Sequence, residues 1–154
     1  MVPTELLLRF PCFQKGDESS LKRLAAITRR VHVDAGEVLF EQGDPSSELF
    51  VVVSGSIEVT QRLGKLPEMS VDTVKEGGLV GWSAMAHPHV RRSTCRAVEP
   101  SELLAIQAGP LRDLCAEVPE LGFSLMELVS QTISRRLEGA WSQVHPGGTG
   151  GQDG

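Results

Sequence analysis

The spacing of hydrophobic residues changes twice along the chain, and these changes predict its organisation. Residues 1–30 carry them at helical intervals, and residues 31–108 carry them largely at alternate positions. Residues 109–141 return to helical intervals, while residues 142–154 are rich in glycine and polar residues. The sequence therefore predicts an N-terminal helical segment, a β-domain, C-terminal helices and a flexible tail.

Two short helices are expected in the N-terminal segment. The first covers residues 4–9 and is followed by Pro11, which cannot continue it. In the second, Asp17 or Ser19 is placed to cap the start, because a short polar side chain can accept from a free amide of the first turn. Apolar residues then recur at helical intervals until about Thr28.

The β-domain is predicted from short strands that are separated by frequent turns. The expected strands cover residues 31–33, 38–40, 48–54, 57–59, 69–74, 94–98 and 103–106. Glycine, proline and aspartate mark turns about every ten residues between them. This spacing is typical of a barrel or a sandwich and not of a βαβ sheet. The fold class is therefore mainly β with flanking helices.

The C-terminal region predicts two helices. Pro110 suits the first turn of one, and a longer helix is expected from Pro119 to Glu138, where Gly139 is placed to stop it. Apolar residues between positions 121 and 137 form a wide stripe along this helix. The stripe either packs against the β-domain or forms a seam with a second subunit, and its width favours a mixture of the two.

A glycine-rich loop, residues 77–94, carries the candidate chemistry; we call it the glycine loop. Three glycines in its first five positions allow sharp turns and close approach. Ser83 is placed to cap one short helical turn, which Pro88 follows. Free amides of such a turn, together with Arg91 and Arg92, describe a phosphate cradle. The alternative is an ordinary turn followed by two surface arginines.

Composition and charge narrow the choice of function. A chain of 154 residues is long enough for one domain with a sizeable core. Its net charge of −5 argues against a nucleic-acid or membrane surface that covers the whole domain, although a local basic cluster can still bind a small anion. The chain has no apolar run that could span a bilayer and no signal-peptide pattern, and its three cysteines form no CxxC pair. A cytoplasmic location is therefore expected.

Neither a metal site nor an enzyme active site is expected. His87, His89 and Cys95 have no fourth ligand at a suitable spacing. Ser83 and Ser93 have no evident base partner that would activate them as nucleophiles.

Several motifs in this order resemble the cyclic-nucleotide-binding domain family, which includes the catabolite activator protein and the kinase A regulatory subunits. The matching motifs are Ala-Gly-Glu-Val-Leu-Phe at 35–40, Gly43-Asp44, the run 49–55, Gly81-Xaa-Xaa-Ala84-Met85 and the stretch 91–97. The resemblance covers residues 10–138. It implies a jelly-roll-like β-roll with N-terminal helices and a long C-terminal helix.

The resemblance also implies a pocket in which the glycine loop is the family's phosphate-binding cassette. Gly81 then lies on the ribose side, and Ser83 and Ala84 offer backbone amides. Where the family has a glutamate that accepts a hydrogen bond from the ribose 2′-hydroxyl, this chain has Trp82. An indole only donates and carries no charge, so Trp82 cannot replace that acceptor.

Four positions after the turn complete the implied site. Counted back from the Arg-Ala pair at 96–97, Arg91 corresponds to the phosphate arginine, and Arg92 takes that place if the loop is one residue shorter. Ser93 and Thr94 lie where the family has small or hydroxylated residues beside the phosphate and the base.

The long C-terminal helix of the family closes over the base, which makes Ser130, Gln131 and Ser134 candidate base contacts. The family often attaches a helix-turn-helix, a channel or a kinase after this helix. About sixteen residues follow Glu138 here, too few for a helix-turn-helix domain, so this chain alone is not expected to bind DNA.

The resulting hypothesis is a regulatory domain that senses cyclic AMP or cyclic GMP, needs no other cofactor and signals through its C-terminal helix. Two alternatives stand beside it. The fold could sense another small anionic effector, because Trp82 replaces the ribose acceptor. It could also be a non-binding interaction module that forms a homodimer through the stripe at 121–137.

Overall fold

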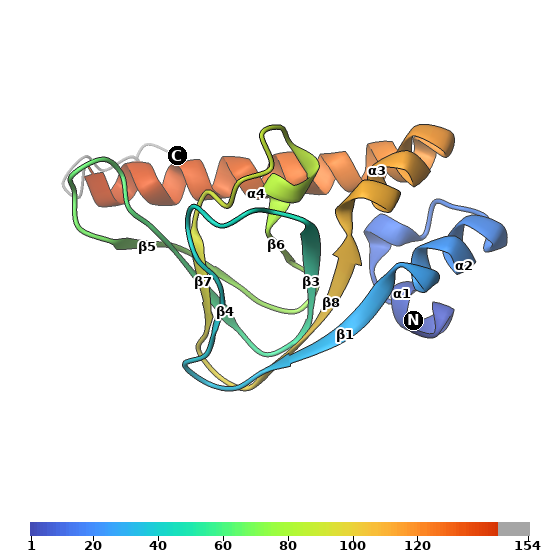
Figure 1. Ribbon diagram of the computed structural model, residues 1–154, viewed down its shortest axis with the longest axis horizontal. Helices are drawn as coiled ribbons and strands as arrows, with labels where there is room; N and C mark the ends of the chain where they lie inside the picture. The colour runs from blue at the N-terminus through green and yellow to red at the C-terminus, as the bar shows by residue number, and fades with distance from the viewer. Residues whose placement is uncertain (145–154) are drawn as a thin grey trace.

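The computed structural model describes residues 1–144 and shows a β-roll with helices at one end and along one side (Figure 1). Residues 142–144, which the sequence assigns to a flexible tail, form the last residues of the long C-terminal helix. The rest of the predicted tail lies outside the described residues.

The N-terminal segment is helical as predicted, with shorter helices. It contains α1 (Thr4–Leu7), a 3₁₀ turn η1 (Pro11–Phe13) and α2 (Glu18–Ala26). Asp17 is the residue that caps α2: its carboxylate accepts a hydrogen bond of 2.8 Å from the amide of Ser20. The helix ends at Ala26 because strand β1 already begins at Thr28.

The roll consists of two four-stranded sheets, in which all paired strands are antiparallel. Its strands are β1 (Thr28–Val33), β2 (Val38–Phe40), β3 (Glu48–Ser54), β4 (Ile57–Gln61), β5 (Met69–Val74), β6 (Leu79–Val80), β7 (Thr94–Ala97) and β8 (Ser101–Gln107). The orders are β1-β8-β3-β6 and β2-β7-β4-β5. This confirms the predicted fold class. Strand β6 was missed, because its two residues lie inside the glycine loop.

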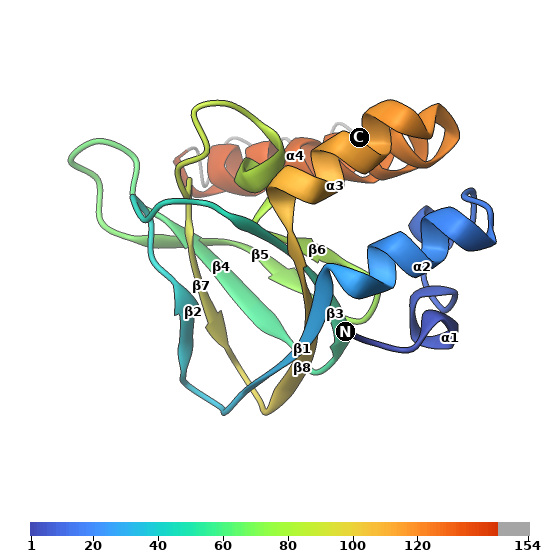
Figure 2. The ribbon, with the colours of Figure 1, turned by 45° about the vertical axis from the view of Figure 1, so that its right-hand side comes forward.

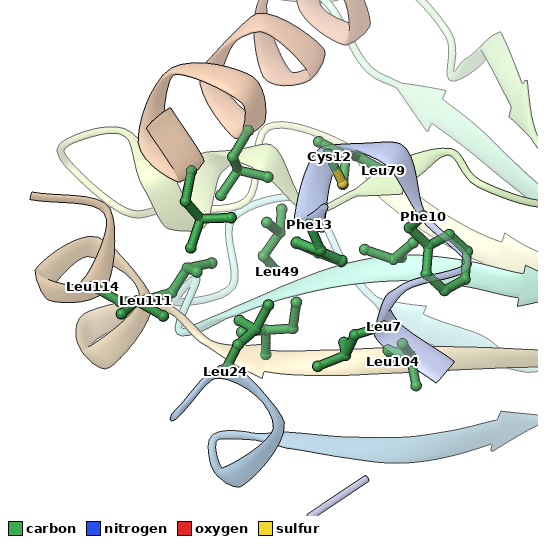
Figure 3. Packing of buried hydrophobic residues seen from close by; sticks show 14 of the residues in the cluster. Leu7, Phe10, Cys12, Phe13, Leu24, Leu49, Leu79, Leu104, Leu111 and Leu114 are labelled. Atoms are coloured by element: carbon green, nitrogen blue, oxygen red, sulfur yellow. The ribbon is translucent and has the colours of Figure 1, made fainter. Parts of the chain in front are cut away.

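Two hydrophobic clusters hold the structure together. One fills the space between the helices and the sheet that contains β3, where Phe13, Leu49 and Leu104 meet (Figure 3). The other lies inside the roll and includes Phe50 and Val52. Strand β3 supplies side chains to both clusters, and this explains its continuous apolar run, since a strand buried on both faces has no polar side.

Helix α3 (Ala108–Glu117) follows β8 and packs against α4 and α2, and helix α4 (Pro119–Val144) lies along the roll on the side of β5 and β6 (Figures 1 and 2). The prediction that Gly139 stops the long helix is wrong. A Cβ at Gly139 would overlap the carbonyl oxygen of Val71 on β5, so this glycine allows α4 to approach the strand closely. Within residues 1–144, none of the helices combines the length and the apolar character that a membrane crossing requires.

Candidate functional site

A recess of about 240 Å³ lies between the glycine loop, strands β4 and β5, and helix α4. Its lining residues are Gln61, Leu63, Val71, Trp82, Arg92, Ser93, Ile133, Arg136, Leu137 and Ala140. The wall is mostly apolar, and two guanidinium groups supply its charge. None of these lining residues is acidic. A small anion with a flat or apolar body fits this combination of groups.

The short turn in the glycine loop begins one residue earlier than predicted. Gly81 adopts a φ of 82°, which is available to glycine at little cost, and the 3₁₀ turn η2 (Trp82–Met85) follows it directly. Ser83 lies inside the turn and does not cap it. Its hydroxyl is buried and pairs with the hydroxyl of Ser46 at 2.9 Å. The amide of Ala84 donates to the Gly81 carbonyl at 3.1 Å, so this amide is already occupied.

Arg91 is buried inside the roll, behind the loop that it supports. Its Nη1 donates to the carbonyl of Gly81 at 3.1 Å, and its Nη2 donates to the carbonyl of Glu48 at 2.8 Å. The guanidinium lies 4.0 Å from the ring centre of Phe40, within the range of a cation–π contact. Burial lowers the pKa of Arg91 to about 10. Two of its nitrogens thus tie the glycine loop to β3.

The third donor of Arg91 has no partner. Its Nε is buried and makes no hydrogen bond, and no other buried side-chain nitrogen or oxygen in residues 1–144 lacks a partner in this way. Arg91 does not line the recess. In the described conformation, this arginine therefore holds the glycine loop in place and does not line the recess.

Arg92 and Ser93 do line the recess. The side chain of Arg92 is exposed, and its carbonyl accepts a hydrogen bond of 3.1 Å from Gln61, which lines the recess as well. Thr94, the first residue of β7, does not line the recess and lines a separate cavity instead. Its hydroxyl accepts from the amide of Gln42 at 2.9 Å.

The recess thus brings together three of the eight residues that the sequence assigns to the site, namely Trp82, Arg92 and Ser93. The other five do not line it, namely Gly81, Ser83, Ala84, Arg91 and Thr94. The indole of Trp82 occupies the wall where the family resemblance places a ribose-binding glutamate. The recess therefore offers apolar surface at that point and no carboxylate acceptor.

Helix α4 contributes a residue that the sequence reading missed. Arg136 is buried, and it donates from Nη2 to the carbonyl of Leu79 at 2.7 Å and from Nε to Asp72 at 3.3 Å. Its neighbour Arg135 donates to the same carboxylate at 3.1 Å. A signal was available: Arg136 falls four residues before Ala140 and four after Thr132, on the buried side of the helix.

The predicted base contacts on α4 do not reach the recess. Ser130 and Ser134 are exposed, and neither lines it. Gln131 lines a separate cavity of about 400 Å³ beside the N-terminal segment. The helix presents Ile133, Arg136, Leu137 and Ala140 to the recess instead, because these residues lie on a different side of the helix from Ser130, Gln131 and Ser134.

The candidate metal ligands lie in different surroundings. Cys95 is fully buried inside the roll, and this burial raises the pKa of its thiol to about 12. The rings of His87 and His89 lie 5.7 Å apart in the glycine loop. Within the described part of the chain, no three histidine, cysteine or acidic side chains are grouped so that they could hold a metal ion.

The match to a family model agrees with this architecture. The model of the cyclic nucleotide-binding domain matches residues 30–118, which is more than half of the chain. The chain therefore belongs to the cyclic nucleotide-binding domain family.

Individual relatives share this fold over most of the chain. A CRP-like cAMP-activated global transcriptional regulator of Mycobacterium tuberculosis is 21% identical over 131 residues, which are 85% of this chain and 58% of that protein. A putative cyclic nucleotide-binding protein from Geobacter metallireducens has a TM-score of 0.75 and 25% identity, and the match covers 89% of this chain and 99% of that one. The regulatory domain of Toxoplasma gondii PKA, solved with cAMP, has a TM-score of 0.72 at 18% identity, and the match covers 85% of this chain and 48% of that one. The chain thus spans little more than half of its Mycobacterium relative.

Proposed function

We propose that this domain is a sensor that binds a small anionic ligand in the recess and reports its presence through α4. Cyclic AMP and cyclic GMP are the first candidate ligands. In this proposal, Arg92 pairs with the phosphate at the mouth of the recess, Ser93 adds a hydroxyl, and the indole of Trp82 packs against the base.

One observation carries the proposal: the glycine loop and helix α4 line the same recess, and each supplies a guanidinium group to it. A guanidinium matches the geometry of a phosphate with two parallel donors. Because α4 forms one wall, a ligand that fills the recess contacts the helix directly. Binding and a change in the packing of α4 are therefore linked in this geometry.

Calorimetric titration with cyclic AMP and cyclic GMP tests the proposal. We expect measurable binding, and we expect Arg92→Gln to weaken it by about tenfold to a hundredfold, because the loss of a hydrogen bond to a charged group costs roughly 1.5–3 kcal/mol. Arg30→Gln is the matched control, since Arg30 is exposed on β1 and does not line the recess. Equal affinity in Arg92→Gln and in the wild type would contradict the proposal.

The absence of an acidic lining residue favours a second candidate ligand class. A cyclic mononucleotide brings a ribose 2′-hydroxyl, which finds no carboxylate acceptor among the lining residues. An anion without a ribose avoids that cost. If the same calorimetry detects no cyclic nucleotide but does detect another small anion, with the same dependence on Arg92, this second class is the ligand.

A homodimer through α4 is the second candidate function. Exposed apolar side chains follow one stripe of the helix at Phe123, Met126, Ile133, Leu137 and Val144. The successive intervals are three, seven, four and seven residues, which keep these side chains near one face of the helix, with Ser130 between Met126 and Ile133 and the buried Ala140 between Leu137 and Val144. The same stripe on a second copy provides the complementary surface that a two-fold dimer requires.

Sedimentation equilibrium tests the dimer. We expect association that depends on concentration, and we expect Phe123→Ser to weaken it at least tenfold, because Phe123 is 71% exposed on the stripe and loses its apolar contact area. Val98→Ser is the control, since Val98 is 57% exposed and lies outside α4. A wild-type chain that stays monomeric at all concentrations would exclude this candidate.

A further inference from the structure

A compact cluster of charged residues fastens α4 to the roll next to the recess. The side chain of Asp72 on β5 is only 7% exposed, and both Arg135 and Arg136 donate to its carboxylate. Arg136 is itself buried and lines the recess, whereas the side chain of Arg135 is 52% exposed and does not line it. One carboxylate therefore faces two guanidinium groups.

The two hydrogen bonds of Arg136 differ in length. Its Nη2 lies 2.7 Å from the carbonyl oxygen of Leu79, while its Nε lies 3.3 Å from the Asp72 carboxylate, at the long end of the range for such a bond. Arg135 lies closer to that carboxylate, at 3.1 Å. The Leu79 carbonyl thus positions Arg136, and the Asp72 contact is the one that can be given up.

The residues that line the recess carry positive charge only, which favours the binding of an anion. Arg92 and Arg136 both line it, no acidic residue does, and Asp72 already receives a hydrogen bond from Arg135. An anion in the recess meets a guanidinium that is already desolvated and held by a backbone carbonyl, so little further ordering is needed when the pair forms.

We propose that Arg136 is the second anion-binding residue of the recess, and that a bound anion replaces Asp72 as the partner of its guanidinium. This inference rests on the proposed function, because it concerns the same recess. When the recess is empty, the Asp72 carboxylate pairs with Arg136, so an incoming anion must compete with it. When the anion is bound, Asp72 keeps Arg135 as its partner.

The replacement changes how the end of α4 is held. Arg136 lies three residues before Gly139, where the helix packs closely on the carbonyl of Val71 in the strand that also carries Asp72. When the Arg136–Asp72 contact is released, α4 loses one of the two charged links, at Arg135 and Arg136, that hold it to β5 just before residues 139–144. Occupancy of the recess is thereby transmitted to the last turns of α4.

The variant Asp72→Asn tests the inference by the sign of its effect. We use whichever of cyclic AMP, cyclic GMP and inorganic pyrophosphate binds the wild-type chain most tightly. Removing the competing carboxylate is expected to tighten binding about threefold to tenfold, a gain of roughly 0.7–1.4 kcal/mol. Asp113→Asn, on the exposed surface of α3, removes the same charge away from the recess and is expected to leave the affinity unchanged.

A second variant keeps the test valid if Asp72→Asn does not fold. Arg135→Gln leaves Asp72 to Arg136 alone, so it is expected to weaken ligand binding several-fold although Arg135 does not line the recess. Arg62→Gln is the matched control, because Arg62 is exposed and does not line the recess either. Hydrogen exchange of residues 139–144 is expected to speed up when the ligand binds.

The outcomes separate this inference from the proposed function. If Arg92→Gln abolishes binding while Asp72→Asn and Arg135→Gln behave like their controls, the sensor stands and the role of Arg136 is wrong. If Asp72→Asn weakens binding, the cluster is purely structural and the inference is overturned. If none of the three anions binds either the wild type or Asp72→Asn, both proposals fail.

Discussion

Replacing Gly139 with alanine is expected to detach the end of α4 from the roll and to lower the free energy of unfolding by about 3 kcal/mol or more. The added Cβ would overlap the carbonyl oxygen of Val71, and backbone atoms on both sides leave no flexible side chain to move away. The helix or strand β5 must therefore shift, and the shift also opens the recess. Chemical denaturation followed by circular dichroism measures the loss.

Gly109→Ala is the control for this prediction. Gly109 also lies in a helix, α3, but the nearest atom to its added Cβ is a terminal nitrogen of Arg112 at 4.0 Å. Alanine is favoured over glycine in a helix by roughly 0.5–1 kcal/mol, but a Cβ on the residue before Pro110 disfavours the helical region, so the two effects oppose each other and this variant is expected to stay within about 1 kcal/mol of the wild type. If both variants gained stability, the close packing of α4 on β5 would be wrong.

Arg91→Met is expected to lower the free energy of unfolding by about 3 kcal/mol, because the variant loses two hydrogen bonds from a charged donor and a cation–π contact inside the roll. Methionine keeps the length and the apolar stem of the side chain, so the loss reports the guanidinium. The glycine loop is expected to become more mobile at Gly81. Thermal or urea unfolding of the variant measures the effect.

Arg92→Met is the matched control, since Arg92 is the next residue and its side chain is exposed. A surface substitution of this kind changes stability by about 0.5 kcal/mol or less. The expected pattern is therefore a loss of stability at Arg91 and a loss of ligand binding at Arg92. An Arg91→Met variant that keeps its full stability but no longer binds ligand would reverse these two roles.

Much of the fold could be predicted because the local patterns and the tertiary structure agree. The continuous apolar run of β3 and the alternation at Val33, Ile57 and Val59 indicated their burial, although Val38 on β2 is exposed. Of the two expected caps of α2, Asp17 is the one observed. The errors lie where tertiary contacts override a local signal. Gly139 is normally a sign that a helix ends, yet here a strand carbonyl requires the missing side chain and the helix continues to Val144.

The candidate site was only partly predictable. The motif identified the glycine loop. Whether the side chain of Arg91 or of Arg92 enters the recess, however, depends on the backbone conformation at these two residues, which the motif does not specify. Arg91 is held inside the roll by backbone carbonyls, at Gly81 in the same loop and at Glu48 far away in the sequence, and a backbone carbonyl carries no side-chain signal. Arg136 was missed as a site residue, and its partner Asp72 could not be identified either, because it lies on a strand far away in the chain.

The wide apolar stripe of helix α4 includes residues of two surfaces, the wall of the recess and the exposed face of the candidate dimer seam. Ile133 and Leu137 line the recess and are also partly exposed, so they belong both to the candidate ligand site and to the candidate dimer seam. A ligand that moves these side chains alters the surface available to a second copy. This arrangement gives a physical route from a bound anion to a partner.

Calorimetric titration of cyclic AMP and cyclic GMP into the wild type, Arg92→Gln and Arg91→Met, at a temperature where all three are folded, tests the central claim most directly. The account predicts that the wild type binds, that Arg92→Gln loses at least tenfold in affinity, and that Arg91→Met loses less than Arg92→Gln. Binding that is abolished in Arg91→Met and unchanged in Arg92→Gln would contradict it, because the anion would then lie inside the roll and outside the recess.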